Sequence, residues 1–169
     1  MQKNLGALLL VVSLLGAAQA AEAGPVEDAL DAQMRGDYAT ALRLFTPAAE
    51  AGDRYAQFSL AFMYNIGQGV QQNYTEAVRW YRLSAEQGYA SAQTNLGNMY
   101  STGHGVRKDL VRADMWYSVA AALFANVSGN SASTQRDAIE ADMTTAQIVR
   151  AQAMAEKCQR SSFRNCDDD

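Results

Sequence analysis

The apolar positions in the middle of the chain recur at the spacing of an α-helix. Ala56, Leu60 and Tyr64 lie four residues apart, and Ala77 and Tyr81 show the same spacing further along. Residues separated by four positions lie on one face of a helix. The pattern therefore predicts two helices in succession, each with one apolar face, which pack against each other as a pair.

The same pattern returns 36 residues later. When residues 53–88 are aligned with residues 89–124, 12 of the 36 positions are identical. The identical pairs are Ala56/Ala92, Gln57/Gln93, Leu60/Leu96, Met63/Met99, Tyr64/Tyr100, Gly67/Gly103, Gly69/Gly105, Val70/Val106, Ala77/Ala113, Trp80/Trp116, Tyr81/Tyr117 and Ala85/Ala121. A fixed period of this length is typical of stacked helical repeats.

A Gly-x-Gly-Val loop separates the two predicted helices of each unit, as "GQGVQQN" at residues 67–73 and "GHGVRKD" at residues 103–109. The first glycine is expected to end a helix in the left-handed conformation, which costs glycine little. Asn73 and Asp109 are favourable N-caps for the second helix. Glu76, three residues after Asn73, completes a capping-box pattern.

The same loop could be imagined as a phosphate-binding turn. A dinucleotide-binding loop follows a strand and needs a third glycine. Here the loop follows a predicted helix, and the third position holds Gln72 or Lys108. We therefore interpret the loop as the turn of a helical hairpin.

The repeat resembles the Sel1-like repeats of exported bacterial proteins. These repeats are a branch of the tetratricopeptide-like helical superfamily. Residues 90–121, "ASAQTNLGNMYSTGHGVRKDLVRADMWYSVAA", match the family pattern almost throughout. Residues 54–85 match with departures such as Ala61 for the usual glycine and Asn73 for the usual aspartate. The resemblance implies an all-α fold, a short right-handed α-solenoid of antiparallel helix pairs with a C-terminal capping helix.

The resemblance extends more weakly to both sides of the two units. Thr144 and Gln147 have the spacing of a capping box at the start of a closing helix. The expected organisation is a signal peptide at 1–20, a degenerate tetratricopeptide-like repeat at 25–52, Sel1-like repeats at 53–88 and 89–124, capping helices at 125–158 and an acidic tail at 159–169.

Residues 1–20 have the features of a secretory signal peptide. Lys3 precedes a short apolar run that ends in Ala18-Gln19-Ala20, and this order is typical of a cleaved signal. The alternative is a retained anchor. We expect a periplasmic or secreted bacterial protein that is not inserted in a membrane after cleavage.

Charge and cysteine content narrow the function classes. The chain carries 14 basic and 18 acidic residues, a net charge of −4, which does not favour nucleic-acid binding. Cys158 and Cys166 are the only cysteines, and we expect them to form a disulfide after export. Their spacing resembles a cysteine pair within the units of Cys-rich relatives. The alternative is two free thiols.

Motifs for catalysis are absent from the sequence. His104 is the only histidine, which argues against a catalytic triad and against a histidine-rich metal site. We interpret it as a loop residue, and we expect no enzyme activity, cofactor or metal. Trp80 and Trp116 could form sugar-stacking platforms, but their repetition at helical spacing predicts core positions instead.

The resemblance implies a non-catalytic scaffold or adaptor of the cell envelope that binds another envelope protein or peptide. An immunity or regulatory protein that sequesters one partner is the alternative. An enzyme acting on β-lactams or peptidoglycan, or a subunit that associates end to end, is less expected. A monomer is expected, and the partner is not identified by the sequence.

Partner contact is expected at first-helix positions that differ between the units. These are Phe58, Phe62, Asn65, Thr94, Asn98 and Ser101. Phe58 and Phe62 share one helix face and would form an apolar anchor beside a polar strip. The alternative is that both rings pack on the preceding half-repeat.

Overall fold

The computed structural model describes residues 24–123 and 131–167, and in these ranges the chain forms eight helices and no strand. The helices are α1 (Pro25–Met34), α2 (Tyr38–Glu50), α3 (Arg54–Ile66), α4 (Tyr74–Ala85), α5 (Ala90–Thr102), α6 (Leu110–Ala122), α7 (Ser131–Glu140) and α8 (Thr145–Arg160). The all-α repeat fold predicted from the sequence is confirmed.

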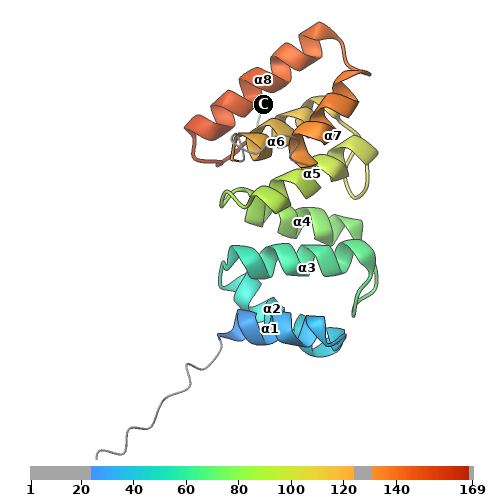
Figure 1. Cartoon of the computed structure of the whole chain (residues 1–169), viewed down its shortest axis with the longest axis vertical. Helices are drawn as coiled ribbons and strands as arrows, with labels where there is room; N and C mark the ends of the chain where they lie inside the picture. The colour runs from blue at the N-terminus through green and yellow to red at the C-terminus, as the bar shows by residue number, and fades with distance from the viewer. Residues whose placement is uncertain (1–23, 124–130, 168–169) are drawn as a thin grey trace, which may run out of the picture.

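The helices form pairs that stack along one direction (Figure 1). Helices α1 and α2, α3 and α4, and α5 and α6 pack as hairpins, and each hairpin contacts the next through α2 with α3 and through α4 with α5. Helices α7 and α8 both pack on α6. The last two helices thus cover the end of the stack, as a short helical array requires.

The repeated apolar residues form the core. Trp116 and Tyr81 are fully buried, and Trp80 is only 6% exposed. Met63 and Met99 fill space between the helices. The prediction that the tryptophans are core residues is confirmed.

The two glycines of each loop have different roles. Gly67 and Gly103 have φ angles of 72° and 80° and end α3 and α5 in the left-handed conformation. Gly105 allows a close approach, because a Cβ atom there would overlap the backbone carbonyl of Tyr74. The first glycine therefore ends a helix, and the second lets the loop pack against the previous unit.

A repeated glutamine links each unit to the one before it. The Gln57 side chain donates to the carbonyl of Ala49 at 3.1 Å, and the Gln93 side chain donates to the carbonyl of Ala85 at 3.1 Å. Both carbonyls lie in the last turn of a helix, where intrahelical donors are missing. The identical glutamine pair in the sequence thus reflects a repeated contact between neighbouring hairpins.

The cap of α4 corrects one prediction. Asn73 caps the helix by accepting from the backbone N–H of Glu76 at 3.1 Å. The Glu76 carboxylate, however, pairs with Arg79 at 2.9 Å, and the N–H of Asn73 donates to the carbonyl of Tyr64. The predicted capping box is therefore wrong here, because the loop already satisfies the N–H that the glutamate would have bound.

The other two predicted caps are confirmed. Asp109 accepts from the backbone N–H of Arg112 at 3.0 Å at the start of α6. Thr144 and Gln147 form a reciprocal capping box at the start of α8. These contacts are local in sequence, which is why spacing alone predicts them.

Some sequence-based predictions lie outside the described residues. The signal peptide at 1–20 and the first part of the capping region, 125–130, belong to this group. Within 24–123 and 131–167, none of the helices has the length and apolar character needed to cross a membrane.

Candidate functional site

A first candidate site is an apolar groove between α1, α3 and the start of α5. It has a volume of about 560 Å³. The groove is lined by Val26, Glu27, Leu30, Gln33, Tyr55, Phe58, Ser59, Phe62 and Tyr89. We call it the α1–α3 groove.

Aromatic rings pack against one another in this groove. The ring centroid of Phe58 lies 5.0 Å from that of Tyr89, 5.9 Å from that of Tyr81 and 6.4 Å from that of Phe62. Phe58 is half-buried, whereas Phe62 is 37% and Leu30 42% exposed. Phe58 therefore supports the floor of the groove, and Phe62 and Leu30 present apolar surface to solvent.

The other four predicted contact residues do not line the groove. The hydroxyls of Thr94 and Ser101 donate to carbonyls of their own helix. The Asn98 side chain accepts from the hydroxyl of Tyr117 at 2.7 Å. Asn65 is half-buried near the end of α3. A role of these four residues in partner binding stays a prediction.

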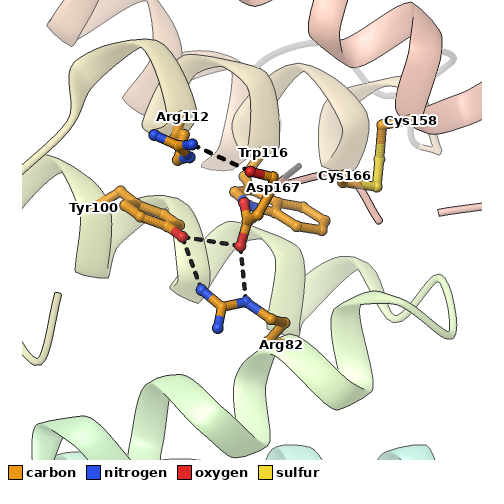
Figure 2. Close-up of polar contacts among 7 residues, drawn as sticks. All are labelled: Arg82, Tyr100, Arg112, Trp116, Cys158, Cys166 and Asp167. Carbon is orange, nitrogen blue, oxygen red and sulfur yellow. Dashed lines mark hydrogen bonds and ion pairs between the residues drawn. A yellow bond between two sulfur atoms is a disulfide. The ribbon is translucent and has the colours of Figure 1, made fainter. Parts of the chain in front are cut away.

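A second candidate site involves the residues that follow α8. Residues 161–167, the Asp167 segment, turn back toward the stack after α8 (Figure 2). Cys158 and Cys166 form a disulfide in the structure, with their Cα atoms 4.7 Å apart. The ring of Phe163 lies against Gly88 in the turn between α4 and α5. Residues 161–167 of the tail that the sequence predicts at 159–169 thus pack on the repeats.

The carboxylate of Asp167 is bound by donors from three helices (Figure 2). Its Oδ2 accepts from Arg82 Nε at 2.7 Å and from the Tyr100 hydroxyl at 2.9 Å. Its Oδ1 accepts from Trp116 Nε1 at 2.8 Å. Arg112 Nη2 donates to the backbone carbonyl of Asp167 at 3.1 Å. We call Arg82, Tyr100, Arg112 and Trp116 the Asp167 pocket.

Arg82 and Tyr100 keep their protons at neutral pH. Burial, followed by the charge of Asp167, raises the pKa of Tyr100 to about 12. Burial is the largest influence on Arg82 and would lower its pKa, but the charges and hydrogen bonds of Asp167 and Tyr100 together outweigh it, and the pKa of the guanidinium is raised. A charge-assisted hydrogen bond of this kind is stronger than a neutral one.

Positive charge surrounds the pocket. The wider cavity has a volume of about 920 Å³, and its wall includes basic side chains from α4, α6, α8 and the loop before α6. These are Arg82, Arg107, Lys108, Arg112 and Arg150. The acidic side chains of the wall are Glu86, Asp109 and Asp167. The cavity is therefore basic although the whole chain carries a net charge of −4.

Sequence reasoning missed this pocket. It assigned Trp116 to the core, which is correct, but the indole N–H also binds the Asp167 carboxylate. One signal was present in the sequence, because the position of Arg82 is occupied by Thr46 and Ser118 in the units 36 residues before and after. The repeat does not require an arginine at this position, because the other units carry Thr or Ser there. The side chain of Arg82 can therefore make a contact that is specific to its own unit.

The remaining candidate residues have structural contacts. The ring of His104 stacks on Tyr74 with a centroid distance of 4.6 Å, which fits its interpretation as a loop residue. In the described part of the chain, no cluster of three or more His, Cys, Asp or Glu side chains could hold a metal ion.

Comparisons with known proteins agree with the architecture. A search of the curated proteins found no match. A crystal structure of c5321, a protective antigen of uropathogenic Escherichia coli with an SLR fold, is 26% identical, with a TM-score of 0.74 over 82% of this chain and 31% of its own length. A Sel1 repeat protein from Oxalobacter formigenes is 33% identical, with a TM-score of 0.57 over 60% of this chain and 40% of its own length.

The chain thus spans less than half the length of either of these solved relatives. The Sel1 repeat model matches residues 31–53, 54–89 and 90–123. The first of these matches overlaps the unit that the sequence suggested was closer to a plain tetratricopeptide hairpin. With three repeats matched over more than half of its residues, the chain belongs to the Sel1 repeat family.

Proposed function

We propose that this chain is a non-catalytic adaptor that binds a segment of another protein in the α1–α3 groove. Sel1 repeat proteins generally mediate protein–protein interactions and are typically non-enzymatic scaffolds. The observation that carries the proposal is the exposure of large apolar side chains around one cavity, with Leu30 at 42%, Tyr55 at 46% and Phe62 at 37%.

The groove suits a partner segment with two or more apolar side chains. Exposed apolar surface that is rimmed by polar residues is typical of interaction sites. Here Glu27 and Gln33 lie beside the rings. Phe58 is held against Tyr81 and Tyr89, so that the floor of the groove is formed before a partner arrives and little ordering is needed on binding.

The test uses exposed groove residues and a matched control. Phe62→Ser and Leu30→Ser remove apolar contact area, and we expect each to weaken capture of the partner by about tenfold or more without a large loss of stability. Val149→Ser on α8 is the control, because Val149 is also an exposed aliphatic residue, at 58%, but lies outside the groove.

The partner is first captured from bacterial envelope extracts with the unaltered protein, and its affinity for each purified variant is then measured by calorimetric titration. Equal affinities for Phe62→Ser, Leu30→Ser and Val149→Ser would overturn the assignment of the groove.

We also propose that the protein works in the periplasm or outside the cell. Lys3 and the apolar run that ends in Ala18-Gln19-Ala20 support export. N-terminal sequencing of protein recovered from the periplasmic fraction should begin at Ala21. A recovered protein that still carries residues 1–20 would contradict cleavage.

A further inference from the structure

We propose that the Asp167 pocket is a binding site for an acidic side chain of another protein, and that the Asp167 segment occupies it as an internal stand-in for that ligand. The segment shows which chemistry the pocket accepts, namely a carboxylate on a short peptide. This inference does not rest on the α1–α3 groove, which has other lining residues.

The donors of the pocket all belong to helices of the repeat core. Arg82 Nη2 donates to the Tyr100 hydroxyl at 2.8 Å, so these two donors are held together by a bond of their own. Trp116 is fully buried, and packing fixes the direction of its N–H. Because the donors belong to α4, α5 and α6, the stacking of two hairpins sets their geometry. A ligand would therefore meet a site that is largely formed in advance.

The arrangement selects a carboxylate. Arg82 offers a charged donor, while Tyr100 and Trp116 offer neutral donors aimed at the same two oxygens. At the equivalent positions 36 residues earlier, Tyr64 and Trp80 are retained but the arginine is replaced by Thr46. The aromatic pair therefore belongs to the repeat frame, and the cation is an addition that gives this junction its affinity for negative charge.

The cavity is larger than the side chain that fills its centre. About 920 Å³ is bounded by five basic residues and, apart from Asp167, by the two acidic residues Glu86 and Asp109. A single aspartate needs only a small part of this volume. A peptide with several acidic residues would place further carboxylates along the same basic wall, and basic surfaces of this kind attract acidic partners over longer distances.

The segment occupies the pocket in a strained conformation. Ser162, Phe163 and Asn165 have φ angles of 56°, 67° and 54°, which are uncommon for residues other than glycine and unfavourable for them. The disulfide between Cys158 and Cys166 keeps the carboxylate close to its donors and so raises its effective concentration there. An external peptide that binds without this strain can compete once the segment is weakened.

The experiment uses the full chain and a defined probe. The probe is a fluorescein-labelled peptide with the sequence of residues 163–169 in which Ser replaces the cysteine, and its control has Asn at all three Asp positions. Binding is measured by fluorescence polarisation to the wild type and to the D167N/D168N/D169N variant, in which none of the three aspartates at positions 167–169 remains.

We expect the triple variant to bind the acidic probe about tenfold or more tightly than the wild type does, and to bind the Asn probe weakly. Adding Arg82→Gln should weaken binding of the acidic probe by about tenfold or more. Tyr100→Phe is the milder companion, which removes one hydroxyl and should weaken binding severalfold. Arg79→Gln in the triple variant is the matched control, because Arg79 also lies on α4 but outside the cavity, and it should leave probe affinity unchanged.

Circular dichroism is used to check that each variant is folded. Equal binding of the acidic and Asn probes by the triple variant would overturn the proposal. Unchanged affinity for the acidic probe after both Arg82→Gln and Tyr100→Phe would overturn it as well. Failure of the triple variant to bind the acidic probe would also overturn it, because Asp167 would then serve only to hold the segment on the repeats. None of these results depends on the partner of the α1–α3 groove.

Discussion

The two described Sel1 hairpins that follow α2 share a frame but differ in where they place polar and charged side chains. In the junction with the first of them, Thr46 donates its hydroxyl to the carbonyl of Leu42 in its own helix at 2.7 Å. In the next junction, the equivalent Arg82 reaches across to Asp167. The side chain at this position thus bonds within its own helix in one junction, whereas in the other junction it bonds to a segment that is distant in the sequence.

A second pair of equivalent positions shows the same trend in the core. Val78 in α4 is buried and apolar, whereas Asp114, 36 residues later in α6, is a fully buried carboxylic acid. The Asp114 Oδ1 accepts from the Ser118 hydroxyl at 3.2 Å, and its Oδ2 has no hydrogen-bond partner among the described residues. In these hairpins the repeated aromatic and small residues keep the fold, while Val78 and Asp114, like Thr46 and Arg82, show that positions between them can differ in charge.

The largest expected effect comes from the repeated tryptophans. Trp80→Ala and Trp116→Ala each remove a large core ring and should cost about 3–5 kcal/mol of the free energy of unfolding. We expect the greater loss for Trp116→Ala, because Trp116 is fully buried and also binds Asp167, whereas Trp80 is 6% exposed and carries Arg79 on its ring face. Urea unfolding measures both losses.

A variant that keeps its unfolding midpoint but loses a ligand would contradict the core assignment. Trp116→Phe is the companion that keeps most of the packing and removes the N–H. It should lose less stability than Trp116→Ala and should still weaken the hold on the Asp167 segment.

The buried acid of the second hairpin makes stability depend on pH. Burial, and then the charge of Glu140, raises the pKa of Asp114 to about 6 from an ordinary 3.8. Arg136 opposes this shift, and Asp137 adds to it. Since the folded state holds the proton more tightly than the unfolded state does, the stability from this group is full below about pH 4 and is lost as the pH rises to about 6.

Asp114→Asn removes this dependence. Relative to the wild type, the variant should gain about 2–3 kcal/mol between pH 4 and pH 7.5, because one pKa unit corresponds to about 1.4 kcal/mol. Urea unfolding at several pH values measures the difference, and other titrating groups cancel in the comparison. Val78→Ala is the control for this core position in the other hairpin and should lower stability equally at every pH. A constant difference between Asp114→Asn and the wild type would contradict the raised pKa.

The disulfide gives the next smaller effect. Cys158→Ser with Cys166→Ser should cost about 2.5 kcal/mol by the chain-entropy argument. It should also release the Asp167 segment, since Cys166 directly precedes Asp167. Thiol counting on protein purified under oxidising conditions should find no free thiol. Two free thiols would contradict the prediction that the exported protein is oxidised.

The repeat frame could be predicted from the sequence because its determinants are local and periodic. Gly67 and Gly103 end helices through their own backbone, and the loop asparagine and aspartate cap the helices that follow within three residues. Burial of Trp80 and Trp116 follows from helical spacing. Each of these features depends on only a short stretch of chain. Because the stretch occurs in both repeats, a feature predicted in one repeat is supported by the same feature in the other.

The two candidate sites were less predictable because they depend on contacts between distant parts of the chain. Arg82 and Asp167 are 85 residues apart, and the path of the segment depends on left-handed residues such as Phe163 that no composition rule indicates. Phe58 and Phe62 were correctly placed on one helix face. The sequence did not show that Phe58 would pack on Tyr81 while Phe62 stays exposed.

The smallest expected effect comes from exchanging the residues that differ between the two junctions, and this exchange tests the comparison most directly. Arg82→Thr gives the second junction the side chain of the first. We expect a loss of stability of at most about 1 kcal/mol, because Arg82 is 37% exposed in its side chain and solvent screens the ion pair. Thr46→Arg, the reverse change, should be close to neutral, because among the described residues no acidic side chain is bonded to Thr46, whose hydroxyl donates to Leu42 in its own helix.

The informative measurement for this exchange is hydrogen exchange of the segment rather than the unfolding midpoint. In Arg82→Thr the amides of residues 163–167 should exchange several-fold faster, while those of α4 and α6 keep their protection, because opening of the segment is a local event. In Thr46→Arg the same amides should be unchanged. If Arg82→Thr left the protection of the segment intact, the aromatic frame would suffice to hold Asp167, and the two junctions would differ in sequence without differing in what they can bind.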